Sequence, residues 1–182
     1  FLREQGWDQD LMTLRRHGRA VIGLCGGYQM LGKYIHDPDG IEGMAGSVDG
    51  LGLLDIETTL TEQKTLTHTT GIETRTGAAI SGYEIHLGQT TGADTAQPMV
   101  HHIEGRDGIN VDGAISPDGQ VAGCYMHGLF ASDTFRSAWL NRHGKASSQI
   151  IFDQQIDTTL DQLANHLAAH ADLDAIARIA GL

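Results

Sequence analysis

The sequence predicts an α/β protein, built as a three-layer sandwich with a mainly parallel central sheet. A short apolar run over 20–24 passes directly into helical periodicity, which is the pattern of a strand, a sharp turn and a helix. Strand patterns recur between 53 and 126, and helical patterns lie at both ends of the chain. In such a sandwich, ligand chemistry gathers at the carboxyl ends of the strands.

The composition describes one globular domain over 1–182. With 182 residues, 40% of them apolar, the chain can bury one sizeable core. No apolar stretch approaches the roughly 20 residues of a membrane span, so no membrane partner is expected. The net charge of −11, with unclustered basic residues, argues against a nucleic-acid partner. Two distant cysteines and no visible signal peptide indicate a reducing, cytoplasmic location.

The first segment, 1–18, predicts a helix that leads into the strand at 20–24. Its leucines are spaced among polar residues, and it ends in basic residues and Gly18, as helices commonly do. The chain opens on Phe1 without an initiator methionine. We therefore expect it to be an N-terminally truncated piece of something longer.

Cys25 stands at the corner between the strand and a helix predicted from the spacing of Tyr28, Leu31 and Ile35. Glycines at 23, 26 and 27 let the backbone turn sharply and leave room for a substrate. The helix dipole favours a thiolate here, and the first free N–H groups point where an oxyanion would form. A buried packing cysteine is the alternative. The neighbouring glycines favour a nucleophile, because a cysteine that only fills space in the core does not need residues without side chains around it.

The middle of the chain predicts an antiparallel extension over 53–87. Turn residues at 36–40 are expected to end the helix that follows Cys25. Strands are expected at 53–60, 64–70 and 71–80. The next strand, 81–88, alternates in character.

In that strand, Glu84 and His86 share one face, and three apolar or aromatic residues share the other. A solvated polar face is the favoured interpretation of this pair taken alone. Adjacent His101 and His102 would point to opposite sides of a strand, and the ten histidines show no metal-ligand spacing. We expect no metal.

The stretch 111–130 predicts a turn at 117–119 and a strand at 121–126 that delivers His127 at its end, beside Gly128. A base would be placed in this way, although a capping or surface histidine is equally consistent with the pattern alone. Cys124 is interpreted as a buried strand cysteine. Ser132 is expected to cap a helix that ends near 143, and the apolar stripes after 150 are expected to face the core.

Three blocks, 23–32, 82–88 and 125–130, occur in an order that resembles the glutamine amidotransferase domain of cobyric acid synthase. The resemblance implies a class I, triad-type amidotransferase with a flavodoxin-like fold. It also implies a larger enzyme, in which an upstream synthetase domain uses ATP and Mg to amidate the carboxylates of a corrinoid. No cofactor is expected in this domain, and no Gly-x-x-x-x-Gly-Lys-Ser/Thr motif occurs in the sequence.

By the same resemblance, Cys25 attacks the side-chain amide of L-glutamine and His127 transfers the proton. The oxyanion and substrate-binding group then comprises Gly26, Gly27, Tyr28 and Gln29, with the Gly26 N–H as the main oxyanion donor. Many triad amidotransferases have a glutamate two residues after the histidine, where this chain has Leu129. The orienting group is therefore unassigned, and Glu84, with His86, is a candidate from its block.

Three alternatives remain open. The first is a sister branch of the same superfamily, either cobyrinic acid a,c-diamide synthase or the amidotransferase of a peptidoglycan precursor. The second is a cysteine hydrolase or peptidase with a similar elbow. The third is a non-catalytic interaction domain, in which the thiol would be unreactive.

Overall fold

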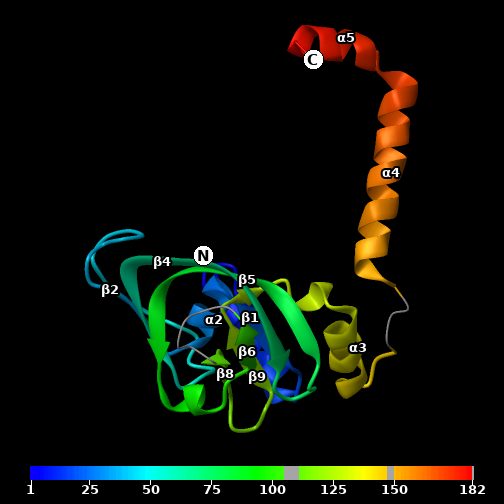
Figure 1. Cartoon of the computed structure of the whole chain (residues 1–182). Coiled ribbons are helices and arrows are strands. Elements are labelled where there is room, and N and C mark those ends of the chain that lie inside the picture. The colour runs from blue at the N-terminus through cyan, green and yellow to red at the C-terminus, as the bar shows by residue number, and fades with distance from the viewer. Residues whose placement is uncertain (105–110, 147–149, 182) are drawn as a thin grey trace. The chain divides into compact units, whose positions relative to one another are not determined.

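The computed structural model describes residues 1–104, 111–146 and 150–181. The chain divides into two compact units, Phe1–Ser147 and Ser148–Leu182, which we treat separately. The single domain expected over 1–182 stays a prediction. The first unit holds every strand of the described chain, and the second holds two helices (Figure 1).

The helices and strands follow one another along both units. The α-helices are α1 (Trp7–Arg16), α2 (Gly26–Leu31), α3 (Asp133–Arg142), α4 (Phe152–His170) and α5 (Leu173–Ala180), and the short 3-10 helices are η1 (Ala93–Ala96) and η2 (Leu129–Ala131). The strands are β1 (Val21–Leu24), β2 (Tyr34–Asp37), β3 (Gly46–Asp49), β4 (Glu57–Glu73), β5 (Ala79–Thr91), β6 (Val100–Glu104), β7 (Val111–Asp112), β8 (Ala114–Ile115), β9 (Val121–Cys124) and β10 (Met126–His127).

The strands form two sheets, in the orders β1-β9-β8 and β10-β5-β4-β2-β3, with β6 and β7 attached to the second through β4. The expectation of a mainly parallel sheet is wrong for the described residues, since only β1–β9 and β2–β4 pair in parallel. The cause is connectivity. Strands joined by short turns, such as β4 and β5, must run antiparallel. The antiparallel extension expected within 53–87 is confirmed.

The strands β4 and β5 form one long curved hairpin (Figure 1). Two strands expected at 53–60 and 64–70 are one strand here, with a register shift between Thr59 and Lys64. The strand expected at 71–80 is interrupted: 71–73 end β4, 79–80 begin β5, and the residues between them form the hairpin turn, where the Gly77 N–H donates to the Glu73 carbonyl at 2.9 Å. Continuous pairing with β5 explains the merger, because each strand supplies the other's hydrogen-bond partners.

The helix after Cys25 is shorter than its apolar spacing predicts. It ends at Leu31, and Ile35 lies in β2 rather than on the helix. Tertiary contacts end it, since the Lys33 N–H donates to the Ile56 carbonyl at 2.8 Å. Gly32 leaves room for this approach, because a β-carbon there would lie 2.7 Å from the same oxygen. The Leu31 carbonyl then accepts hydrogen bonds from the loop at 53–54, at 2.9 Å each.

Two apolar clusters form the core of the first unit. One lies around α3, with Phe135, Met126 and Leu129 fully buried. The other packs α2 against β1 and β9 through Tyr28 and Leu31. The expected cap of α3 is confirmed, because Ser132 Oγ accepts the Phe135 N–H at 3.3 Å.

The second unit contains α4 and α5. The core-facing role expected for its apolar stripes is wrong within this unit, because neither helix has a buried residue. Two helices joined end to end give one another too little surface to cover a stripe. In the described part of the chain, no helix has both the length and the apolar character needed to cross a membrane.

Candidate functional site

Cys25 occupies a strained corner. Its backbone has φ 54° and ψ −119°, and it is the only non-glycine residue with positive φ in the described chain. Hydrogen bonds hold this conformation, because the Cys25 N–H donates to the Cys124 carbonyl at 2.9 Å and the Cys25 carbonyl accepts the Tyr28 N–H at 2.9 Å. Strain of this kind is typical of a nucleophile elbow. The sharp turn predicted from the neighbouring glycines is therefore made by the cysteine itself.

The glycines around Cys25 do not adopt unusual dihedral angles. One of them allows close packing, and the other two leave space beside the cysteine. A β-carbon at Gly23 would lie 2.6 Å from the Gly27 carbonyl oxygen, so Gly23 lets α2 pack directly on β1. A β-carbon at Gly26 or Gly27 would meet nothing within 4 Å. The first N–H groups of a helix have no carbonyl inside it. Those of Gly26 and Gly27 thus have no acceptor within α2 itself.

The two cysteines differ sharply in environment. Cys25 is half-buried and its Sγ donates to the Ile85 carbonyl oxygen at 3.4 Å. Cys124 is fully buried, and desolvation raises the pKa of its thiol well above the ordinary value. The expectation that Cys124 is a buried strand cysteine is confirmed.

His127 lies at the end of the chain segment that continues from β9. Its ring stacks on Tyr83, with ring centroids 4.9 Å apart and planes 2° from parallel. Gly82 allows this approach, since a β-carbon there would lie 1.8 Å from the His127 carbonyl oxygen. The buried Nε2 of His127 has no hydrogen-bond partner in the described part of the chain. That nitrogen therefore has the capacity for one further hydrogen bond.

The topology carries Cys25 and His127 to one region. Cys25 follows β1, which pairs in parallel with β9, and His127 follows β9. Both then meet β5, where Cys25 Sγ contacts the Ile85 carbonyl and His127 pairs with Tyr83. Cys25 Sγ and His127 Nε2 share no hydrogen bond, so their direct pairing stays a prediction. Catalytic hydrogen bonds are often long without substrate.

The other members of the expected substrate group lie within the packing. Tyr28 is buried and packs edge-on against Tyr125, with ring centroids 5.2 Å apart. Gln29 Nε2 donates to the Leu87 carbonyl at 3.0 Å and lies 3.3 Å from the Tyr125 hydroxyl. Gln29 therefore fastens α2 to β5. A role of either residue in binding substrate stays a prediction.

Glu84 and His86 share a face of β5, as alternation predicts, but the solvated-face interpretation is wrong. The side chains of Glu84 and His86 are 0% and 3% exposed, whereas Tyr83, on the opposite face, is exposed. His86 Nε2 lies 3.7 Å from Glu84 Oε2, and His102 Nε2 lies 3.0 Å from Glu84 Oε1. The polar face is covered because β6 and β7 bring their own side chains onto it.

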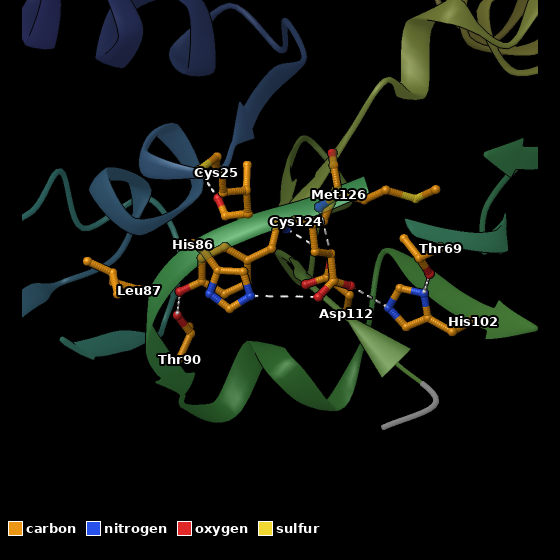
Figure 2. A network of polar contacts seen from close by, with 12 residues as sticks. Cys25, Thr69, His86, Leu87, Thr90, His102, Asp112, Cys124 and Met126 are labelled. Carbon is orange, nitrogen blue, oxygen red and sulfur yellow. Dashed lines mark hydrogen bonds and ion pairs between the residues drawn. The ribbon is translucent and has the colours of Figure 1, made fainter. Parts of the chain in front are cut away.

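Asp112 completes this buried polar cluster, and sequence reasoning missed it together with His102. Figure 2 shows Asp112 between His86 and His102. Burial and the charge of Glu84 raise the pKa of Asp112 to about 6. In the sequence, Asp112 stands next to Gly113, a pairing that is typical of a turn. The signal that could have found it is the buried strand pattern just after it.

One side of the cluster borders a cavity. His86 and Asp112 line a cavity of about 430 Å³, together with Tyr28 and Tyr125. Glu84, His102 and Asp112 offer possible metal-ligand atoms within 4.8 Å of one another. The cavity thus borders one carboxylate and one imidazole of the cluster, those of Asp112 and His86.

The orienting group of His127 is not at the usual position. Leu129 is fully buried in the apolar cluster near Phe135, so the site is built without a carboxylate there. Glu84 pairs with Met126 in the β5–β10 register, whereas His127 pairs with Tyr83. Side chains alternate along a strand, so Glu84 and His127 occupy opposite faces. A direct orienting role for Glu84 stays a prediction.

Comparison with known proteins adds an independent finding. The family model of the CobB/CobQ-like glutamine amidotransferase domain matches residues 1–135. The cobyric acid synthase of Hyphomonas neptunium is 51% identical over 175 residues, which cover 96% of this chain and 34% of that protein. That of Caulobacter sp. K31 is 50% identical over 182 residues, covering 100% of this chain and 37% of that protein.

The chain thus spans about a third of the length of the curated relatives it matches. The solved structure of PurLQS from Thermotoga maritima is a weaker match, with 15% identity and a TM-score of 0.47, covering 84% of this chain and 68% of that one. The family match extends from α1 through β10 and into α3, and so includes both Cys25 and His127. This chain belongs to the CobB/CobQ-like glutamine amidotransferase family.

Proposed function

We propose that this chain hydrolyses glutamine as the amidotransferase domain of a cobyric acid synthase. The observation that carries the proposal is the strained elbow at Cys25, set on the strand next to the one that leads to His127. The relatives that match nearly the whole chain are cobyric acid synthases, which favours this branch over its sister branches. It also favours an amidotransferase over an unrelated cysteine hydrolase.

In the first half of the reaction, Cys25 Sγ attacks the side-chain amide carbon of L-glutamine. The thiol proton passes to His127, whose Nε2 is otherwise unpartnered. The carbonyl oxygen becomes an oxyanion, which the N–H groups of Gly26 and Gly27 stabilise at the start of α2. The C–N bond then breaks, His127 returns the proton to the leaving nitrogen, and ammonia departs from a thioester.

In the second half, water attacks the thioester carbon. His127 takes a proton from that water, the oxyanion forms in the same place, and the C–S bond breaks. The thiolate regains the proton from His127, and glutamate leaves. Cys25 stays at the elbow through both halves, because neither half requires the backbone to change conformation.

We further propose that the ammonia is used by an ATP-dependent synthetase domain of the same longer protein, which amidates the carboxylates of a corrinoid. ATP and Mg would bind in that domain, and this domain would need no cofactor of its own. We place the protein in the cytoplasm. The complete amidotransferase domain would be a flavodoxin-like three-layer sandwich that includes the parallel pair β1 and β9.

The test uses the natural full-length protein and measures glutamate released from glutamine. Cys25→Ser and His127→Ala should each abolish release, and Cys124→Ser should leave it near the wild-type rate. Acid-quenched wild-type protein should carry a glutamyl thioester on Cys25 by mass spectrometry. Wild-type turnover in Cys25→Ser would overturn the proposed function.

A further inference from the structure

The bend between β9 and β10, formed by Tyr125 and Met126, determines how His127 leaves the sheet. β9 belongs to one sheet and β10 to the other, so the chain changes hydrogen-bonding partners here. Asp112 bridges this change. Its Oδ2 accepts the Tyr125 N–H at 2.8 Å and the Met126 N–H at 3.1 Å. One carboxylate oxygen therefore fixes two consecutive peptide groups immediately before His127.

We propose that Asp112 is a positioning residue for His127, a role that rests on the proposed function of His127 as the base. Asp112 acts through the main chain, because holding the two N–H groups fixes the direction in which residue 127 emerges from the bend. On the other side of His127, the Tyr83 ring stacks on the imidazole, and the backbone at Gly82 lies close to the His127 carbonyl. Together the contacts leave the ring one well-defined location.

The chemistry of the cluster explains why a carboxylate is tolerated at this place. Burying an acid is unfavourable unless its oxygens receive hydrogen bonds, and charged acceptors make the stronger bonds. Asp112 receives two from the bend. His102 Nε2 lies 3.0 Å from Glu84 Oε1 and its Nδ1 lies 2.7 Å from Thr69 Oγ1, so the neighbouring carboxylate has an imidazole partner (Figure 2). The cluster thereby connects β4, β5, β6 and β7 to the bend.

The decisive variant is Asp112→Leu in the natural full-length protein. Leucine has nearly the shape of aspartate but accepts no hydrogen bond, so the Tyr125 and Met126 N–H groups lose their shared acceptor. We expect kcat for glutamine hydrolysis to fall about 100-fold, the effect of a misplacement near 1 Å, with KM unchanged. Asp112→Asn keeps an acceptor oxygen and should restore most of kcat.

The matched control is Asp94→Leu. Asp94 is also buried and its Oδ2 accepts a backbone N–H, that of Asp55 at 2.7 Å, in a different part of the fold. This variant should keep the wild-type kcat. Equal losses of kcat in Asp94→Leu and Asp112→Leu, or wild-type kcat in Asp112→Leu, would overturn the positioning role.

Two further results separate this role from its alternatives. Activity lost on dialysis against a chelator and restored by Zn²⁺ would overturn it, because Glu84, His102 and Asp112 would then be metal ligands. Wild-type activity in His127→Ala would defeat the proposed function itself. An inactive His127→Ala together with a fully active Asp112→Leu would defeat only the positioning role.

Discussion

The backbone N–H of Cys25 donates to the carbonyl of Cys124 at 2.9 Å, so the two cysteines of this chain sit next to one another across parallel strands. Their thiols nevertheless have opposite environments. The Cys124 side chain is enclosed by the apolar cluster around Phe135, whereas Cys25 begins a helix beside open space. Of these two neighbouring cysteines, Cys124 thus has a packing role, and Cys25 is placed for chemistry.

Selective labelling follows from this contrast. Brief treatment of the natural protein with a glutamine-mimicking diazo-ketone should modify Cys25 and leave Cys124 unmodified, since burial both blocks access to Cys124 and raises its pKa. Peptide mass spectrometry identifies the labelled residue. Cys124→Ser should label as the wild type does, and Cys25→Ser should not label. Equal modification of the two cysteines would contradict the assignment.

The strained backbone at Cys25 predicts an unusual order of stabilities. Glycine has no β-carbon and adopts φ 54° without steric cost, whereas alanine has a β-carbon and still pays that cost. We expect Cys25→Gly to be more stable than Cys25→Ala by about 1–2 kcal/mol, although glycine normally destabilises relative to alanine. Both variants should be inactive. Thermal unfolding of the two proteins measures the difference, and a less stable glycine variant would show that the corner is relaxed.

The sequence was sufficient to predict the elbow, because a strand, a cysteine among glycines and a helix are all local patterns. It also placed His127 correctly at a strand end. The length of α2 was not predictable in the same way. Apolar spacing through Ile35 suggested a longer helix, and only the contact between Gly32 and Ile56, made across the chain, shows why the helix ends.

The buried polar cluster was beyond local reasoning for a similar reason. Alternation assigns Glu84 and His86 to one face of β5, but it does not say which face is covered. That depends on β6 and β7, which supply His102 and Asp112 from distant sequence. Parallel pairing was overestimated because local patterns do not show that β8 pairs with β9, and β10 with β5, in antiparallel orientation.

Gly82 offers a test of how closely β5 must approach His127. A methyl group added there would lie 1.8 Å from the His127 carbonyl oxygen, so the backbone of one strand has to move. We expect Gly82→Ala to lower kcat about 100-fold. Gly43→Ala is the control, because its β-carbon meets nothing within 4 Å, and it should keep the wild-type rate. Steady-state glutaminase assays compare the two, and an unaffected Gly82→Ala would mean that His127 tolerates displacement.

Asp112 makes the stability of the fold depend on pH. Burial and the charge of Glu84 raise its pKa from 3.8 to about 6, so between these values the folded protein holds a proton that the unfolded chain releases. The contribution of this residue to the free energy of unfolding is therefore present below pH 3.8 and is lost as the pH rises through about 6. His102 opposes the shift without reversing it.

Asparagine does not titrate, so Asp112→Asn removes this dependence. Between pH 4 and pH 7, the free energy of unfolding of Asp112→Asn should rise relative to wild type by up to about 3 kcal/mol, the equivalent of the pKa shift. Urea unfolding across this range measures the difference in the free energy of unfolding. Hydrogen exchange of the β9 amides measures it independently. Glu84→Gln should move the wild-type step to lower pH, because it removes the repelling charge. If the difference in the free energy of unfolding between Asp112→Asn and wild type stays constant with pH, Asp112 is ionised throughout this range. The cluster would then stabilise both of its carboxylates in the charged form.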